Sequence, residues 1–187
     1  MKKFYIDYFN KFNEIYDEFV NNETNLELIK KFENEIIKTI KNNGIFIFAG
    51  NGGSYADALH FSAEFSGKFI NYKRKPLKSI TLGSNGSSLT AISNDFGYKD
   101  VFSREIDPYL KDEDYILVLL STSGSSKNIL NILNIRNLNK KKIFLFTGKN
   151  FKKKIKINSF KFNSLTTSHI QECYKLLIHS VLLKLNL

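Results

Sequence analysis

The sequence predicts an α/β fold in which a parallel sheet is covered by helices on both faces. Short apolar runs, rich in β-branched and aromatic residues, alternate along the chain with segments of helical periodicity. The run YILVLL at residues 115–120 is apolar throughout, as a strand buried on both faces must be. Loops rich in glycine or serine directly follow two of these runs, where parallel sheets carry their sites.

The composition excludes several other classes of protein. A chain of 187 residues, 42% of them hydrophobic, can bury a substantial core, and we expect a single domain over residues 1–187. No apolar run approaches the roughly 20 residues of a membrane span, and residues 1–12 lack a signal-peptide core, so we expect no membrane partner. Cys173 is the only cysteine, which rules out an intrachain disulfide and favours a reducing cytoplasm. Its thiol is expected to be a small buried group.

The formal net charge of +10 brings nucleic acids and anionic substrates into consideration. Lysines gather at residues 140–142 and 149–161. A solvated basic face explains these runs at least as well as a nucleic-acid site, and no recognised nucleic-acid-binding module accompanies them. We therefore expect no nucleic-acid partner.

The first 43 residues show the periodicity of two helices. Apolar side chains spaced by three or four form one face of each, namely Phe4, Tyr8, Phe12, Ile15 and Phe19, then Ile29, Phe32, Ile36 and Ile40. Thr24 and Glu27 form a capping box that predicts the start of the second helix. The aromatic side chains suit an oligomer interface, so we expect these helices to hold subunits together.

Residues 44–67, GIFIFAGNGGSYADALHFSAEFSG, combine a buried strand at 45–49, a glycine loop and a helix. Free N–H groups at a helix N-terminus attract anions, so this arrangement predicts an anion site, although its spacing is neither that of a P-loop nor that of a dinucleotide-binding loop. One stripe of the helix carries Asp57, His60 and Glu64. The opposite stripe, expected to pack on the sheet, is formed by Ala58, Leu59, Ser62 and Phe65. A solvated surface pair is the alternative interpretation of His60 and Glu64.

Further strands are expected at residues 79–82, 114–120, 143–147 and 155–162. A helix is expected over residues 99–109, after a short helix and a turn at residues 93–97, where asparagine and aspartate precede glycine.

A second anion cradle is predicted at residues 121–126, STSGSS, which open a helix to about residue 138. An ordinary ST-turn with an N-cap would use one or two hydroxyls, whereas five hydroxyls occur in these six residues. The last helix begins at Thr166 or Thr167 and carries Gln171, Glu172 and His179.

Segments spread over most of the chain resemble the phosphoheptose isomerases, a family with the sugar isomerase (SIS) fold. These segments are GNGGS, ADALHFSAEFSG, LTAISNDFGYKDVFSREI, STSGSSKNIL and HIQECYKLLIH. That family converts D-sedoheptulose 7-phosphate to D-glycero-D-manno-heptose 7-phosphate for the heptose of lipopolysaccharide, capsule or other surface polysaccharides. The resemblance implies a five-stranded, flavodoxin-like, doubly wound parallel sheet and a homotetramer.

The resemblance also assigns site residues. Glu64 and His179 would be the acid/base pair of an enediol mechanism, since a carboxylate and an imidazole suffice for its proton transfers. The implied substrate contacts are Asn51, Gly52, Gly53, Ser54, Asp57, Glu64, Asn94, Asp95, Ser121, Thr122, Ser123, Ser126 and Gln171. One zinc ion per subunit would be held by His60, Glu64, Gln171 and His179, whose side chains are acceptable zinc ligands.

Three positions depart from the family pattern. Tyr55 and Leu59 replace a small residue and a glutamine, and His169 stands where the family usually has arginine. These changes bear on which ketose phosphate is the substrate more than on the class of reaction.

Non-catalytic proteins of the same fold are the alternative. The DnaA initiator-associating protein lacks the histidine of the last helix, which is present here as His179, so catalysis is favoured. An SIS sensor or etherase domain would not need His60 and Glu64.

We also expect each active site to be shared between subunits. Gln171 and His179 are eight residues apart on one helix, which separates them by about 12 Å along its axis. One helix would then give Gln171 to one site and His179 to a neighbouring site, in an oligomer closed by symmetry. In this form of sharing, Glu64 and His179 of one site come from different chains.

Overall fold

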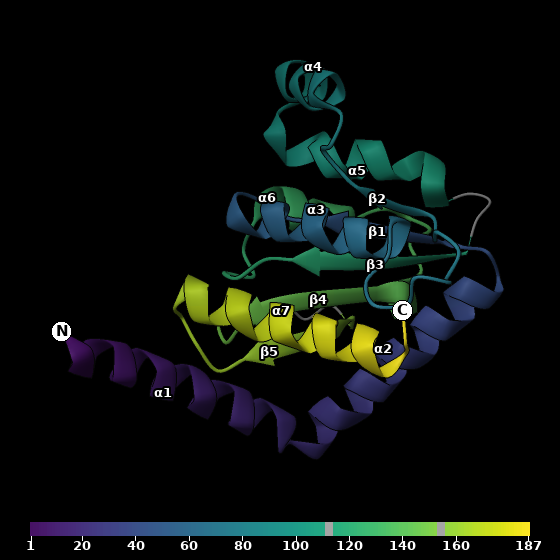
Figure 1. Ribbon diagram of the computed structural model, residues 1–187. Helices are drawn as coiled ribbons and strands as arrows, with labels where there is room; N and C mark the ends of the chain where they lie inside the picture. Colours follow the sequence, from purple (N-terminus) through teal and green to yellow (C-terminus); the bar gives the residue numbers. More distant parts are fainter. Residues whose placement is uncertain (111–113, 153–155) are drawn as a thin grey trace.

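The computed structural model describes residues 1–110, 114–152 and 156–187. These residues form the expected five-stranded parallel sheet, with the strand order β2-β1-β3-β4-β5 (Figure 1). The strands are β1 (Ile45–Ala49), β2 (Ser79–Thr81), β3 (Tyr115–Leu120), β4 (Ile143–Gly148) and β5 (Asn158–Phe162). This is the flavodoxin-like order, whose switch point lies between β1 and β3. The loops that follow β1 and β3 therefore meet where such folds bind ligands.

Helices cover both faces of the sheet (Figure 1). They are α1 (Lys2–Val20), α2 (Glu23–Lys41), α3 (Gly53–Ser66), α4 (Gly86–Phe96), α5 (Val101–Ile106), α6 (Lys127–Ile132) and α7 (Thr167–Lys184). Short 3-10 turns are η1 (Tyr98–Asp100), η2 (Asp107–Leu110) and η3 (Lys140–Lys142). No helix of the described ranges has the length and apolar character needed to cross a membrane.

The strands supply alternate side chains to two hydrophobic cores. Phe46 and Phe48 of β1 enter the core shared with α1, α2, α3 and α7, whereas Ile45, Ile47 and Ala49 enter the core beside α5 and α6. Every residue of β1 and β3 is buried, as strands covered on both faces require. Cys173 is buried in the first core, and this burial raises the pKa of its thiol to about 12.

The N-terminal helices are correctly predicted, but the capping box is wrong. Helix α2 begins at Glu23, and its cap is Asn22, whose side-chain oxygen accepts a hydrogen bond from the Asn25 N–H at 3.2 Å. Ile15 and Phe19 of α1 are buried, whereas Phe4 is 68% exposed. The first half of α1 thus carries aromatic side chains that the chain itself leaves uncovered.

Several other expected boundaries also change. Residues 93–96 form the last turn of α4, and α6 ends at Ile132 instead of continuing to residue 138. The helix expected over residues 99–109 is the short α5, flanked by η1 and η2. Strand β5 begins at Asn158, and residue 155, its expected start, lies outside the described residues. Leu59 does not pack on the sheet, because it is 41% exposed, and the buried Phe61 takes that place.

Candidate active site

The glycine loop after β1 brings its backbone very close to the start of α3. A Cβ on Gly50 would lie 2.4 Å from the Ser54 carbonyl oxygen, so the turn requires glycine at this position. Gly52, the N-cap of α3, has a φ of +55°, in the region that favours glycine. The first N–H groups of the 14-residue helix α3 therefore border the loop, as the anion-site prediction requires.

Side chains of α7 hold the first turns of α3, directly after this loop. The buried Tyr174 donates a hydrogen bond from its hydroxyl to Asp57 Oδ2 at 2.7 Å, and the same hydroxyl lies 3.1 Å from Ser54 Oγ. Burial raises the pKa of Tyr174, so its phenol stays protonated and can donate at all working pH values. A Cβ at position 53 would lie only 2.6 Å from Gln171 Nε2. Glycine at this position therefore leaves room for the Gln171 amide.

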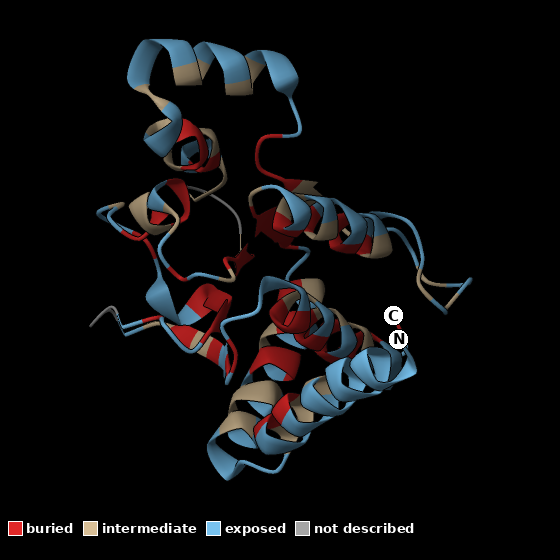
Figure 2. Cartoon of the chain, turned by 90° about the vertical axis from the view of Figure 1, so that its left-hand side faces the viewer, coloured by how far each residue is buried: buried red, intermediate tan, exposed pale blue. Residues whose placement is uncertain are grey.

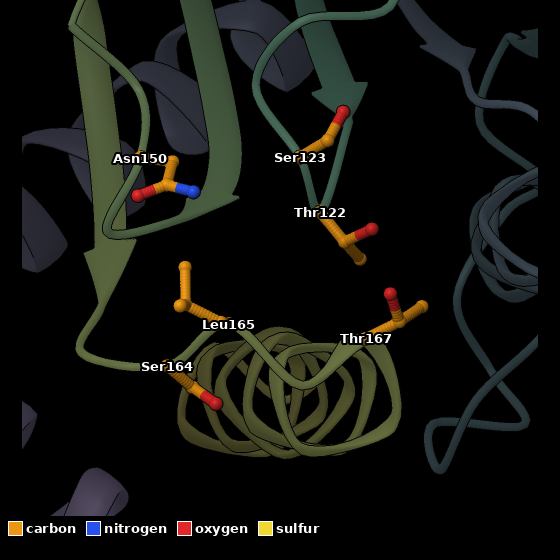
Figure 3. A pocket seen from close by; sticks show the side chains of 6 residues that line it. All are labelled: Thr122, Ser123, Asn150, Ser164, Leu165 and Thr167. Carbon is orange, nitrogen blue, oxygen red and sulfur yellow. The ribbon is translucent and has the colours of Figure 1, made fainter.

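The serine loop follows β3 at the same edge of the sheet. Ser121 Oγ donates to Ser126 Oγ at 3.1 Å, which closes the loop over Gly124, a residue with a φ of +65°. Thr122 and Ser123 line a polar cavity of about 210 Å³ with Asn150, Ser164, Leu165 and Thr167 (Figure 3). The cavity thus lies between the serine loop and the start of α7, and its lining supplies hydroxyl and amide groups for an anion.

His60, Glu64 and His179 form a second cluster. One potential ligand atom from each of the three lies within 4.8 Å of the other two. Nε2 of His60 lies 3.0 Å from Nε2 of His179 and 3.5 Å from Oε1 of Glu64. Two imidazole nitrogens and a carboxylate oxygen are donors that suit zinc, so this set fits the metal that the sequence implied.

Aromatic rings fix the imidazole of His179. Phe69 is stacked on it, with ring centroids 5.4 Å apart, and Phe61 meets it edge-on at 5.5 Å. Burial lowers the pKa of His179, and the neighbouring His60 lowers it further. The ring is therefore biased towards the neutral form, which has a nitrogen free to accept a proton or bind a metal.

The guanidinium of Arg74 braces the end of α3 that carries Glu64. It donates to the carbonyl oxygens of Glu64 and Phe65 at 2.8 and 3.0 Å, and also to those of Gly67 and Lys75. The last carbonyls of a helix lack intrahelical partners, so Arg74 adds to the C-cap Gly67 and fixes the turn that carries the carboxylate.

The loops and the histidine cluster lie at opposite ends of the sheet. Glu64 is 11 residues beyond Gly53, or about 16 Å along α3. Near that end of the helix, Ser62 Oγ lies 2.8 Å from Ser79 Oγ, at the first residue of β2. Gln171 stays at the glycine loop, so the structure does not bring it to His60, Glu64 and His179 within one chain.

Asn94 and Asp95 lie on α4, which has no buried residue and stands away from the sheet (Figures 1 and 2). Asn94 Nδ2 donates to Asp95 Oδ1 at 2.9 Å, and both side chains are exposed. The contact between this region and the glycine loop comes from η1, where Tyr98 donates from its hydroxyl to Asn51 Oδ1.

Sequence reasoning missed four residues that support the site: Arg74, Tyr98, Asn128 and Tyr174. Tyr98 and Asn128 both hydrogen-bond the side chain of Asn51. Tyr174 could have been noticed, because it lies three residues after Gln171 and therefore near it on one face of the predicted helix. No periodicity in the sequence links the other three to their partners.

Comparison with known proteins identifies the family. The model of the SIS domain family matches residues 7–144. The phosphoheptose isomerase of Helicobacter pylori (strain P12) is 44% identical over 104 residues, which cover 56% of this chain and 53% of that protein. That of Glaesserella parasuis serovar 5 is 34% identical over 177 residues, which cover 91% and 88%.

A solved structure agrees over nearly the whole chain. The phosphoheptose isomerase GmhA from Neisseria gonorrhoeae superposes with a TM-score of 0.80 and 28% sequence identity, over 96% of this chain and 95% of that one. The chain therefore belongs to the SIS domain family and, within it, to the phosphoheptose isomerases.

Proposed function

We propose that this protein is an aldose–ketose isomerase that converts D-sedoheptulose 7-phosphate to D-glycero-D-manno-heptose 7-phosphate through an enediol. It acts in the cytoplasm, in heptose synthesis for lipopolysaccharide or capsule. The observation that carries the proposal is the cluster of His60, Glu64 and His179 in a chain whose two loops have the layout of anion cradles. Family membership supports the same reaction.

The reaction needs one group for the carbon proton and another for the oxygen proton. The carboxylate of Glu64 takes a proton from C1 of the ketose, while the imidazole of His179 gives a proton to the oxygen on C2. His179 then takes the proton of the C1 hydroxyl and Glu64 returns its proton to C2, which completes the aldose and restores both groups. Phe61 and Phe69 hold the imidazole for these transfers and restrict its contact with water.

The serine loop binds the phosphate of the substrate in this proposal. Hydroxyls of Ser121, Thr122, Ser123 and Ser126, with backbone N–H groups at the start of α3, supply donors for a phosphate dianion. The rim of the cavity contributes Asn150 and Thr167, which are also polar and uncharged.

A zinc ion suits the donor set of the histidine cluster. His60, Glu64 and His179 would hold it, and Gln171 from another subunit would be the fourth ligand. When bound, the metal supplies Lewis-acid polarisation of the substrate carbonyl.

Distances within the chain favour a site shared between subunits. The reacting carbons of a seven-carbon sugar lie roughly 10 Å from its phosphate in an extended chain, estimated from ordinary bond lengths. That reach is shorter than the roughly 16 Å of α3 between the glycine loop and Glu64. A phosphate in the loops of one chain thus needs Glu64 and His179 from a neighbouring chain. A homotetramer closed by symmetry, with the exposed half of α1 at an interface, would build every site this way.

This form of sharing corrects the one expected from the sequence. Within one chain Gln171 lies at Gly53 and His179 at His60, which supports separate places for the two residues. Glu64 accompanies His179 in the same chain, which supports a site that takes both groups from one subunit.

Incubation with a panel of ketose phosphates, followed by NMR, tests the proposed function. We expect aldose formation from sedoheptulose 7-phosphate, with faster turnover than from five- or six-carbon ketose phosphates. Elemental analysis of the same preparation, purified without chelator, should find zinc, and His60→Ala should lose it. Formation of no aldose from any member of the panel would refute the proposal.

A further inference from the structure

A reciprocal pair of amide hydrogen bonds joins the two loops of the site. Asn51 of the glycine loop donates from Nδ2 to Asn128 Oδ1 at 2.9 Å, and Asn128 of α6 donates from Nδ2 to Asn51 Oδ1 at 2.8 Å. Asn128 is only 3% exposed and lies two residues beyond the serine loop. The pair therefore ties the end of β1 to the end of β3.

A backbone group fixes which way the pair faces. The N–H of Ile129 donates to Asn128 Oδ1 at 3.0 Å, so this atom must be the acceptor oxygen. The amide nitrogen of Asn128 then faces Asn51 Oδ1, and the amide nitrogen of Asn51 faces Asn128 Oδ1. The orientation of the partly buried Asn51 is thus set by a backbone N–H of α6 through Asn128.

Tyr98 adds a third hydrogen bond to the same oxygen. Its hydroxyl donates to Asn51 Oδ1 at 2.9 Å from η1, which follows the helix that carries Asn94 and Asp95. Asn51 Oδ1 consequently accepts two hydrogen bonds, while its amide nitrogen uses one of two N–H groups within the described chain. The remaining N–H is available to a ligand in a fixed direction.

We propose that Asn128 is a positioning residue for substrate binding, which together with Tyr98 orients the Asn51 amide so that its free N–H donates to the sugar phosphate. This role rests on the proposed function, and Asn128 itself touches neither substrate nor metal. An amide fixed in advance loses little conformational freedom on binding, so the benefit appears in affinity. The proton-transfer groups Glu64 and His179 are unaffected, so the rate of the bound substrate is preserved.

A double-mutant cycle on the full-length protein tests this role. We measure KM and kcat with sedoheptulose 7-phosphate, and its Kd by calorimetry, for Asn51→Ala, Asn128→Ala and the double variant. Asn128→Ala should raise KM and Kd about ten-fold and change kcat by less than about two-fold. Because Asn128 acts through Asn51, the double variant should bind no more weakly than Asn51→Ala.

Asn158→Ala is the matched control. Asn158 is also a buried asparagine with two hydrogen bonds from its Nδ2, to the carbonyl oxygens of Lys141 and Ile143, but it begins β5 at the other end of the sheet. This variant should lose thermal stability as Asn128→Ala does, with KM unchanged. A rise in KM shared by both variants would trace the effect to destabilisation and overturn the role of Asn128.

Tyr98→Phe provides a second variant should Asn128→Ala fail to fold. Tyr98 is 54% exposed, so its substitution should leave the fold intact. It should raise KM about three-fold with kcat preserved. Unchanged KM in Tyr98→Phe and in a folded Asn128→Ala, or effects of Asn51 and Asn128 that simply add, would overturn the proposal. A wild-type protein that neither binds nor converts the sugar would instead refute the proposed function, and with it any substrate contact by Asn51.

Discussion

His179 illustrates how packing prepares a single side chain for chemistry. Its imidazole is stacked on Phe69, edged by Phe61 and placed 3.0 Å from the imidazole nitrogen of His60. Burial and the second imidazole both lower its pKa. A surface histidine would have neither a fixed ring nor this bias towards the neutral form, so the cluster differs from a solvated His–Glu pair.

Glu64→Gln tests the assignment of the base. The variant keeps the shape of the side chain and removes its basic oxygen, so kcat should fall at least about 100-fold. Glu14→Gln, which changes an exposed glutamate paired with Lys11 on α1, serves as the control and should retain activity. Turnover of Glu64→Gln close to that of wild type would show that another group takes the carbon proton.

At this scale the sequence predicted residue types better than contacts. His60 and Glu64 were placed together because four residues make one helical turn, and the structure agrees. The partners of Asn51 could not be predicted in this way. Asn128 is 77 residues away, and its hydrogen bonds depend on the order in which β1 and β3 pair.

Among the elements, α3 carries both halves of the proposed chemistry. Its N-terminus borders the glycine loop, and its C-terminal half carries Glu64, braced by Arg74. Because the helix runs back along the sheet, these two functions are held apart by its length. The length of one helix is thus the reason for our proposal that a complete site takes groups from a second chain.

Asn22→Ala tests the observed start of α2. Loss of its cap to the Asn25 N–H should lower the free energy of unfolding by about 1 kcal/mol. Thr24→Ala is the matched control, because Thr24 lies within the first turn, and the free energy should stay within about 0.5 kcal/mol of wild type. Urea denaturation measures the free energy of unfolding of both variants. A larger loss for Thr24→Ala than for Asn22→Ala would support the capping box of Thr24 and Glu27 instead.

Strands were easier to predict than helix ends. The β-branched and aromatic runs of β1, β3 and β4 occur between clear breaks, whereas α6 stops at Ile132 although the apolar spacing continues to Ile135 and Leu138. Those two side chains still pack in the core, but through turns instead of a helix. Periodicity therefore located the buried residues correctly without defining the backbone that carries them.

For the whole molecule, a charged cluster connects elements far apart in the sequence. Lys142 Nζ lies 2.7 Å from Oδ1 of Asp114, the residue before β3, and 2.9 Å from Glu35 Oε2 of α2. The lysine side chain is 9% exposed. Burial alone would raise the pKa of Asp114, but hydrogen bonds from Lys142 and Asn42 lower it overall. Burial alone would likewise lower the pKa of Lys142, but its two carboxylate partners raise it overall.

Lys142→Met should lower the free energy of unfolding at pH 7 by roughly 2 kcal/mol, because two partly buried carboxylates lose their cation. Asp114 stabilises the fold above its unfolded pKa, and this contribution is lost as pH falls through the lower folded value. Lys142 stabilises below its unfolded pKa, and this contribution is lost as pH rises through its higher folded value. The difference in the free energy of unfolding between wild type and Lys142→Met should therefore shrink below about pH 4.

Urea denaturation at pH 7, 5 and 3 measures that difference. Lys184→Met is the control, because Lys184 pairs with Glu33 through a lysine side chain that is 64% exposed. This variant should change the free energy of unfolding by no more than about 0.5 kcal/mol. A difference for Lys142→Met that stays constant from pH 7 to pH 3 would show that the ion pairs do not cause it.

Subunit complementation tests most directly the central claim that each isomerase site takes its phosphate loops from one chain and Glu64 with His179 from another. Ser123→Asp places a negative charge on the exposed serine loop and should repel the phosphate, whereas Ser123→Asn serves as its uncharged control. Refolding inactive Ser123→Asp with inactive Glu64→Gln should restore activity at about a quarter of the sites in randomly mixed oligomers.

Mixing Glu64→Gln with His179→Ala should restore nothing, because neither chain then carries an intact proton-transfer pair. Native mass spectrometry confirms the mixing, and the rate of aldose formation is the measured quantity. We predict recovery in the first mixture alone. No recovery in the first mixture, or recovery in the second, would contradict the claim.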